Sequence, residues 1–418
     1  MNKTILQFLI PIITVIFFVS CSGASENSMQ DDTIGPTGDN GNNPNQDIDI
    51  SGGLYPNLPD PLTTKSGQKV EDVATWENIR RPEILNIFTD SVYGRMPKTN
   101  EYTSMSSVVN NTPLTNGTGV RKVVEFSITG PNGTYSFQLP VYLPNSNQKA
   151  PIFILINHRS KIFGLDPNSG YFPLDLLFSK GYGAAVVNVD DFTEDHNGRY
   201  KNGLLEQFNM TGIYDWKCLS AWAFVTSRMV DYLETDAVVD ASKIAVIGHS
   251  RSGKAAIWAG AHDQRIALTC VNNSGCTGDA LARNFTGETI EKITRIFPRW
   301  FSDKYPEYSN RDTTLPFDQH QLLSLVAPRL LAQGVASGDA GADPIGQFYS
   351  SVFAQPVFKL YGKADLKWTV NDAIKRNITE SVVVENGNMQ FHMRVGSHDL
   401  KTQDWSYYIN FSDEHWKN

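Results

Sequence analysis

Several side chains with chemical potential lie within one short segment of the chain, residues 247–256, which reads IGHSRSGKAA. Ser250 follows Gly248 by two positions, after an apolar run that favours a strand and before alanines that favour a helix. A serine on such a strand–turn–helix is held as an exposed nucleophile. Position 252 is Ser rather than Gly, so the segment departs from G-x-S-x-G. This match alone fits a structural turn equally well.

Two cations lie beside this serine, Arg251 and Lys254. The backbone N–H of the residue after a nucleophile commonly helps to bind the oxyanion, and a guanidinium there can stabilise developing negative charge. Two cations also suit a polar or acidic substrate. The alternative is that both side chains face solvent on the following helix.

Short apolar runs, separated by stretches with helical spacing, make up most of the chain after residue 60. Residues 122–143 predict two strands joined by a turn, and residues 214–233 predict a helix. Continuous Val, Ile and Ala runs are typical of buried parallel strands, which we expect at 151–157, 183–189, 243–247, 268–272, 329–333 and near 382–384. Alternating strands and helices predict a doubly wound α/β domain over roughly residues 60–418.

Charge is unevenly distributed along the 418 residues. The chain has 36 Lys and Arg against 44 Asp and Glu, a formal net charge of −8. Residues 22–60 contain acidic residues but no Lys or Arg, so the rest of the chain is close to neutral. Because non-specific binding to nucleic acid requires a basic surface, we expect no nucleic acid partner.

The first 21 residues have the pattern of an export signal. Lys3 precedes an apolar run at 5–19 that is short for a membrane span. Cys21 follows between serines, which indicates a lipoprotein signal whose cysteine is lipidated; the alternative is an ordinary signal peptide with an incidental cysteine. We expect an exported outer-membrane or periplasmic lipoprotein of a Gram-negative bacterium, attached to the membrane only through Cys21. Residues 22–60, rich in Ser, Gly, Asn and Asp, predict a flexible acidic linker.

Three further cysteines follow, at positions 218, 270 and 276. Their odd number allows at most one internal disulfide, and their spacing is that of neither a CxxC pair nor a zinc finger. We therefore expect no structural metal site, and at least one of these cysteines to be a small buried apolar residue.

The segment from Gly248 to Lys254 resembles the G-C/H-S-R-x-G-K signature of the glucuronoyl esterases, carbohydrate esterase family 15. Further motifs follow in the family's order and spacing, which makes the resemblance more specific than any one motif. These motifs lie at 258–261, 273–276, 287–289, 297–301, 318–320, 327–329, 396–400 and 404–405. The sequence is similar to a bacterial member of the family.

This resemblance implies an α/β-hydrolase fold, a three-layer sandwich around a mostly parallel sheet, with a single catalytic domain at 61–418. It also implies hydrolysis, without a cofactor, of the ester between a (4-O-methyl-)glucuronic acid carboxyl group and an alcohol, as in linkages between glucuronoxylan and lignin. The expected partner is a glucuronoxylan or glucuronate ester substrate, bound by a monomer.

Within the resemblance, Ser250 matches the nucleophile and His398 the general base. The base deprotonates the serine and then protonates the departing alcohol. The chain has eight histidines, of which His158, His320 and His392 are the other plausible candidates for the base. We expect those three to be structural or to line the site.

The acid of the triad departs from the better-known family pattern. Many members have a Glu shortly after the strand that follows the nucleophile, but the matching residue here is Asn273, which cannot carry a negative charge. Some bacterial members instead use an acid after the next strand. The segment 338–344, GDAGADP, offers Asp339, which best matches the family, and Asp343 as second choice.

For substrate binding, Lys254 and Glu288 match positions that contact the uronate hydroxyls in relatives. Trp300 is expected either to line the site or simply to pack. A Trp common two residues beyond the second-site acid is Gly341 here, which removes an expected sugar contact. The segment 157–159 follows a strand where such folds have a second oxyanion donor, but its local match is weak.

Two other functions stay open from the sequence. One is another carbohydrate ester hydrolase, such as an acetyl xylan esterase, with the same triad. The other is a catalytically inactive surface lipoprotein that binds glycan. The presence of Ser250, Arg251, Lys254 and His398 argues against inactivity, whereas Asn273 and Gly341 leave it open.

Overall fold

The computed structural model describes residues 55, 57–159, 168–283, 287–363 and 381–417, all within the unit Ile50–Asn418. The predictions for the signal, for Cys21 and for residues 22–54 therefore lie outside the described residues. The end of the predicted linker contacts the folded body. The ring of Tyr55 lies 5.2 Å from that of Tyr349, and the Pro59 carbonyl accepts a hydrogen bond from His320.

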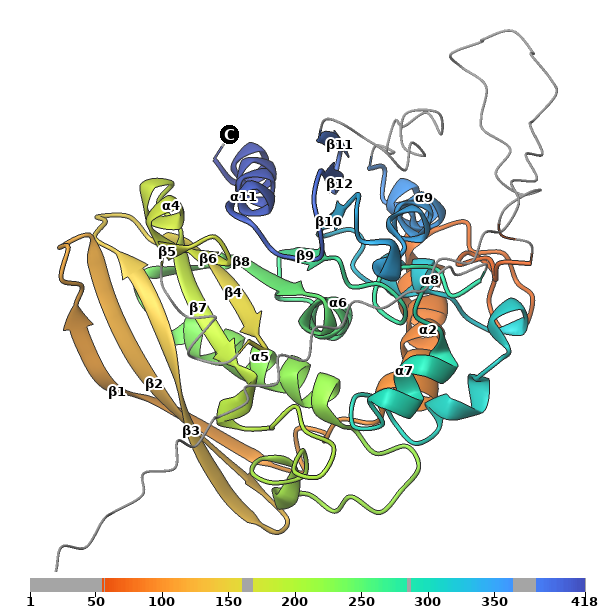
Figure 1. Cartoon of the computed structure of the whole chain (residues 1–418), viewed down its shortest axis with the longest axis horizontal. Helices are drawn as coiled ribbons and strands as arrows, with labels where there is room; N and C mark the ends of the chain where they lie inside the picture. The colour runs from red at the N-terminus through yellow and green to blue at the C-terminus, as the bar shows by residue number, and fades with distance from the viewer. Residues whose placement is uncertain (1–54, 56, 160–167, 284–286, 364–380, 418) are drawn as a thin grey trace, which may run out of the picture. The chain divides into compact units, whose positions relative to one another are not determined.

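A ten-stranded mixed sheet crosses the described part of the chain in the order β1-β2-β3-β7-β4-β8-β9-β10-β12-β11 (Figure 1). Strands β7, β4, β8, β9, β10 and β12 run parallel, whereas β1 to β3 and β11 join antiparallel. The strands are β1 (Thr103–Pro113), β2 (Gly119–Gly130), β3 (Gly133–Pro144), β4 (Ala150–Asn157), β7 (Gly183–Asn188), β8 (Val239–His249), β9 (Leu268–Asn272), β10 (Leu330–Ala336), β11 (Val382–Asn386) and β12 (Met389–Arg394).

Helices cover both faces of the parallel strands, which gives three layers (Figure 1). Successive side chains of a strand point to opposite faces. In β4, Ile154 belongs to the core under α5 (Cys218–Thr235) and α6 (Arg251–His262), whereas Phe153 belongs to the core under α4 (Leu174–Ser179) and α11 (Thr402–Trp416). Both faces are apolar, so these strands read as continuous apolar runs.

The remaining helices and a small two-stranded sheet surround this sandwich. They are α1 (Val73–Thr75), α2 (Arg81–Phe88), α7 (Ile290–Ile296), α8 (Gln319–Ser324), α9 (Pro344–Leu360), β5 (Asn168–Ser169) and β6 (Phe172–Pro173). Short 3₁₀ and π turns lie between them.

Most predicted elements are found, with three differences. The segment near 382–384 forms β11, which is antiparallel, and β12 is the parallel neighbour of β10. The helix expected from residue 214 begins at Cys218, because the backbone of Lys217 is still extended. Strand β1 was not predicted, since it is exposed along its whole length and shows no apolar alternation.

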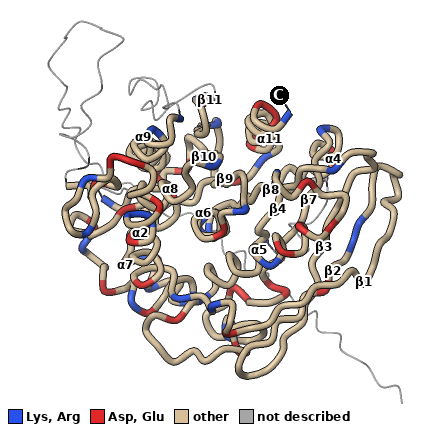
Figure 2. The backbone as a smooth tube through the Cα atoms, turned by 180° about the vertical axis from the view of Figure 1, so that it is seen from behind, with Lys and Arg blue, Asp and Glu red and all other residues tan. Residues whose placement is uncertain are grey.

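Acidic and basic residues are interspersed along the described backbone (Figure 2). Within the described ranges, no helix has both the length and the apolar character needed to cross a bilayer.

Candidate active site

Ser250 lies at the junction of β8 and α6 in a backbone conformation that serine rarely adopts, with φ 57° and ψ −127°. Its N–H donates to the carbonyl of Asn272 at 2.8 Å, which ties the turn to the end of β9. A Cβ on Gly248 would lie 2.0 Å from the carbonyl oxygen of Ser252, so glycine is required there. Strain of this kind persists at functional sites because the surrounding structure enforces it.

Ser252 explains the departure from G-x-S-x-G. Its buried Oγ accepts the N–H of His249 at 3.0 Å and lies 2.9 Å from the carbonyl oxygen of the same residue. Gly253 provides the close approach expected of the second glycine, because a Cβ there would lie 2.8 Å from that of Ser274. The turn 248–253, hereafter the elbow, is therefore closed by a hydroxyl and by a glycine one position later.

The structure pairs His398 with Asp339 rather than with Asp343. The Nδ1 of His398 lies 2.5 Å from Oδ2 of Asp339, which follows β10. The His398 side chain is 44% exposed, whereas that of Asp339 is 10% exposed. Asp343 instead caps α9, because its Oδ1 accepts the N–H of Gly346 at 3.0 Å.

Asn273 has a structural role at the place where many relatives have an acid. Its Oδ1 accepts the N–H of Ala336 at 2.8 Å. Its Nδ2 donates to Oδ1 of Asn272 at 3.0 Å and to the carbonyl of Asp399 at 3.4 Å. A carboxylate would repel both of these oxygens, so the amide suits this position and joins β9, β10 and the loop that carries His398.

A cavity of about 270 Å³ lies beside the elbow and contains most of the predicted site residues. Its lining includes Ser250, Arg251, Lys254, Asn273, Glu288, Phe297, Trp300, Asp339, Gly341 and His398. The structure therefore brings the proposed nucleophile, base and acid together with every predicted substrate contact.

Arg251 is held in place by Asp195, a residue that the sequence reasoning missed. Its Nη1 lies 2.6 Å from Oδ2 of Asp195, and its guanidinium lies 5.0 Å from the ring centroid of Trp300. Oδ1 of Asp195 also accepts from Arg299 at 2.5 Å and from the indole of Trp300 at 2.9 Å. Burial alone would raise the pKa of Asp195. The charge and hydrogen bond of Arg251, together with the hydrogen bonds from Trp300 and Arg299, outweigh burial and hold that pKa below its usual range.

No sequence signal distinguishes Asp195 from its neighbours. Residues 189–196 read VDDFTEDH and contain several acids. Only the fold determines which of them faces Arg251.

Lys254 does not face solvent, so that alternative is wrong for this residue. Its side chain is 3% exposed, and Nζ donates to the carbonyls of Ser274 and of Cys276, the latter at 2.6 Å. Oε2 of Glu288 lies 3.6 Å from the same nitrogen. The pair presents a buried cation and a carboxylate to the cavity.

Trp300 both lines the cavity and packs. Its ring is stacked on Phe297 with centroids 3.9 Å apart, and its N–H is already donated to Asp195. Gly341 also belongs to the lining, and a Cβ there would meet only Oδ1 of Asp339, at 3.9 Å. The missing Trp therefore leaves open space.

The other candidate histidines have structural partners. His392 contacts Asp404 at 2.9 Å, His320 contacts the Pro59 carbonyl, and Nδ1 of His158 lies 3.1 Å from Oγ of Ser252. Burial, reinforced by the charge of Arg251, holds the pKa of His158 well below its usual value.

Residues 157–159 are not among the residues that line the cavity. Asn157 donates to Asn188 at 2.6 Å, and Arg159 binds Asp399 at 2.5 Å. The segment therefore supports the residue after His398 and has no observed part in an oxyanion site.

Cys218, Cys270 and Cys276 are buried free thiols. Burial raises the pKa of each, to about 12 for Cys276. In the part of the chain that the structure describes, no group of three or more His, Cys, Asp and Glu side chains is arranged to hold a metal ion.

Comparison with known proteins identifies the family. A family model for fungal glucuronyl esterase matches residues 126–362. A carbohydrate esterase of an unknown prokaryotic organism is 33% identical over 398 residues, covering 86% of this chain and 89% of that protein. A 4-O-methyl-glucuronoyl methylesterase of Phanerochaete carnosa is 28% identical over 324 residues, covering 74% of this chain and 73% of that protein.

Solved structures agree with this result. A glucuronoyl esterase from Solibacter usitatus superposes with a TM-score of 0.76 at 32% identity, covering 86% of this chain and 98% of that one. A family 15 glucuronoyl esterase from Teredinibacter turnerae gives a TM-score of 0.73 at 26% identity, covering 86% and 89%. The fold is that of the α/β-hydrolases, as predicted. The chain belongs to carbohydrate esterase family 15, the glucuronoyl esterases.

Proposed function

We propose that this protein is a serine-type esterase that hydrolyses esters of (4-O-methyl-)glucuronic acid. The observation that carries the proposal is the 2.5 Å contact between Asp339 and His398 at a cavity that Ser250 also lines. The activity named for the Phanerochaete carnosa relative, 4-O-methyl-glucuronoyl methylesterase, supports the same reaction for this family member.

In the first half of the reaction, Nε2 of His398 accepts the hydroxyl proton of Ser250 while Oγ attacks the ester carbonyl carbon. Asp339 holds Nδ1–H of the imidazole and stabilises the imidazolium that forms. The backbone N–H and the guanidinium of Arg251 stabilise the oxyanion of the tetrahedral intermediate. When this intermediate collapses, the bond to the alcohol breaks, and the alcohol departs with the proton from His398.

In the second half, water hydrolyses the uronic acyl ester on Ser250. His398 takes a proton from the water as its oxygen attacks the acyl carbon, and then returns that proton to Oγ as the serine leaves. The products are free enzyme and glucuronic acid, which ionises in solvent.

Recognition of the sugar is assigned to the buried Lys254 and the partly exposed Glu288, with the ring of Trp300 as an apolar wall. A desolvated donor beside a carboxylate acceptor that faces the cavity suits sugar hydroxyls. A sugar lacking such a hydroxyl would leave these polar groups unpaired, which discriminates strongly against it.

The open space at Gly341 supports a second candidate function, hydrolysis of other carbohydrate esters such as acetylated xylan. Its Cβ position meets no atom closer than 3.9 Å, so nothing there excludes a different acyl or sugar group.

The test measures kcat/KM of the purified protein on benzyl glucuronate and on acetylated xylan in parallel. Preference for the glucuronate ester is the expected result. Preference for acetyl release would favour the second candidate, and binding of glucuronoxylan without turnover of either ester would favour the inactive glycan-binding protein.

We also propose that the protein is exported, carries a lipid on Cys21 and is a monomer. Residues 1–21 support the first two parts of this proposal. Incorporation of labelled palmitate that is lost in Cys21→Ala tests the anchor, and the molar mass in solution tests the monomer.

A further inference from the structure

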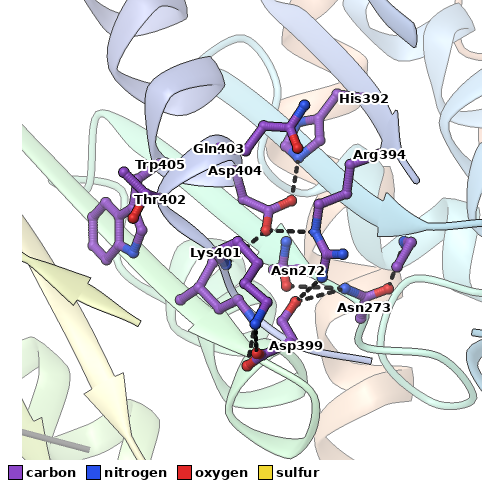
Figure 3. Close-up of polar contacts among 12 residues, drawn as sticks. Asn272, Asn273, His392, Arg394, Asp399, Lys401, Thr402, Gln403, Asp404 and Trp405 are labelled. Carbon is purple, nitrogen blue, oxygen red and sulfur yellow. Dashed lines mark hydrogen bonds and ion pairs between the residues drawn. The ribbon is translucent and has the colours of Figure 1, made fainter. Parts of the chain in front are cut away.

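A buried ion pair lies next to the loop that carries His398 (Figure 3). Arg394 ends β12, and Asp404 lies in the first turn of α11, so the pair joins the two elements that flank the loop. The Nε of Arg394 lies 2.8 Å from Oδ2 of Asp404, and their side chains are 3% and 0% exposed.

The guanidinium also binds the backbone on either side of the histidine. Nη2 of Arg394 donates to the carbonyl of Ser397 at 3.0 Å and to the carbonyl of Asp399. These carbonyls belong to the residues immediately before and after His398. A planar guanidinium provides several donors in fixed directions, so it can hold two carbonyls and a carboxylate at once, which an ammonium on a flexible stem does less well.

Asp404 is fully engaged and fixes the arginine. Its Oδ1 lies 2.9 Å from Nε2 of His392, and its Oδ2 accepts the N–H of Lys401 at 2.8 Å (Figure 3). Burial alone would raise the pKa of Asp404, but the hydrogen bond and charge of His392 and the charge of Arg394 outweigh it, so that pKa lies below its usual range.

His398 needs such an anchor because nearly half of its side chain is exposed, although its ring lies 4.6 Å from that of His249. His398 also lies on a loop rather than on a strand or helix. Side chains on loops keep a productive geometry only when surrounding groups fix the backbone. A buried ion pair, moreover, adds little net stability, since desolvation offsets most of the attraction. A positional role accounts for this pair better than a contribution to stability.

We propose that Arg394, oriented by Asp404, is a positioning residue for the general base. It holds the peptide groups on both sides of His398 so that the imidazole lies between Asp339 and Ser250. This inference rests on the proposed role of His398.

The first test is a double-mutant cycle on benzyl glucuronate with Arg394→Gln and His398→Ala. Arg394→Gln alone should lower kcat about 100-fold with KM nearly unchanged, as expected for a small displacement of a reacting group. In the His398→Ala background the same change should have almost no effect, because residues that act as a unit are non-additive. Equal losses in both backgrounds would overturn the proposal.

A matched control comes from a second buried pair, Arg283 and Asp318. Their side chains are also 3% and 0% exposed, and Arg283 also binds two backbone carbonyls, those of Leu315 and Phe317. Arg283→Gln should lower the free energy of unfolding. The kcat per folded molecule should not show the decrease expected for Arg394→Gln. A comparable loss of kcat in this control would show that Arg394 acts through general stability.

Two further measurements keep the proposal testable. If Arg394→Gln does not fold, Asp404→Asn, which keeps the size of the partner, should show the same non-additivity with His398→Ala. If the wild-type protein does not cleave glucuronate esters, the proposed substrate is wrong. The rate at which a fluorophosphonate labels Ser250 then tests the positioning: a slower rate in Arg394→Gln supports it, and an unchanged rate overturns it.

Discussion

At the scale of single residues, two aspartates four positions apart have different roles. Asp339 contacts the imidazole of His398, whereas Asp343 caps α9. The resemblance predicted Ser250, His398 and Asp339 together, and the structure brings all three to one cavity. The order of nucleophile, acid and base along the chain can be predicted from a sequence. Which aspartate contacts the histidine depends on the geometry of the loop.

Asp339→Asn should lower kcat on a glucuronate ester by about 10⁴-fold, because an amide does not stabilise the imidazolium. Asp343→Asn should keep most of the activity and change the free energy of unfolding by about 1 kcal/mol or less, since Asn is also a good helix cap. Steady-state kinetics on both variants make the comparison. Collapse of activity in Asp343→Asn alone would transfer the role to that residue.

Asp195→Asn should also lower kcat, because Arg251 loses the carboxylate that fixes it. The loss should be smaller than the roughly 100-fold expected when an oxyanion donor itself is removed. Asp303→Asn is the matched control, since Asp303 also pairs with a cation, Lys217, but is 61% exposed and does not line the cavity. Equal kcat values for the two variants would argue against a role of Asp195 through Arg251.

At the scale of elements, the sequence predicted what periodicity and turn chemistry encode. Strands β4, β7, β8, β9 and β10 could be predicted from their apolar runs, because both faces of these strands are buried. Strand β1 could not be predicted, because its residues are mostly polar and exposed and it joins the sheet through backbone pairing with β2. Asp195 and Arg394 were missed for a related reason, since long-range contacts between loops and strand ends leave no local pattern.

The close packing of the elbow predicts that one added methyl group at Gly248 lowers both stability and activity. In Gly248→Ala the new Cβ would lie 2.0 Å from the carbonyl oxygen of Ser252, so the turn must open. We expect a loss of about 3 kcal/mol in the free energy of unfolding and no detectable turnover. Chemical denaturation and activity are compared with Gly170→Ala, whose Cβ would meet nothing closer than 3.5 Å. Near-native activity of Gly248→Ala would contradict the observed turn.

At the scale of the whole molecule, buried histidines predict lower stability in acid. Burial lowers the pKa of His262 to about 4 and holds those of His158 and His249 well below the usual value. Below pH 6.5 or so the unfolded chain therefore binds more protons than the folded one, and the free energy of unfolding falls as pH is lowered. Burial also lowers the pKa values of His320 and His415. It raises the pKa of Asp279 to about 6, and those of Asp190 and Asp312, and these three groups act in the opposite direction.

We therefore expect the free energy of unfolding to be highest above about pH 6.5, where the histidines are mostly neutral in the unfolded chain as well. It should fall by about 2 kcal/mol or more between pH 7 and pH 5. Urea denaturation at several pH values measures it. His262→Gln should reduce the slope, because one of the titrating histidines is removed. Constant stability over this range would show that these histidines are not held neutral.

The proposed reaction is hydrolysis of a glucuronate ester by Ser250, assisted by His398 and Asp339. The most direct measurement is the rate of alcohol release from benzyl glucuronate by the purified protein and by Ser250→Ala under the same conditions. We expect turnover by the wild-type protein and a loss of at least about 10⁴-fold in the variant. Turnover that survives in Ser250→Ala, or no turnover by the wild-type protein, would contradict it.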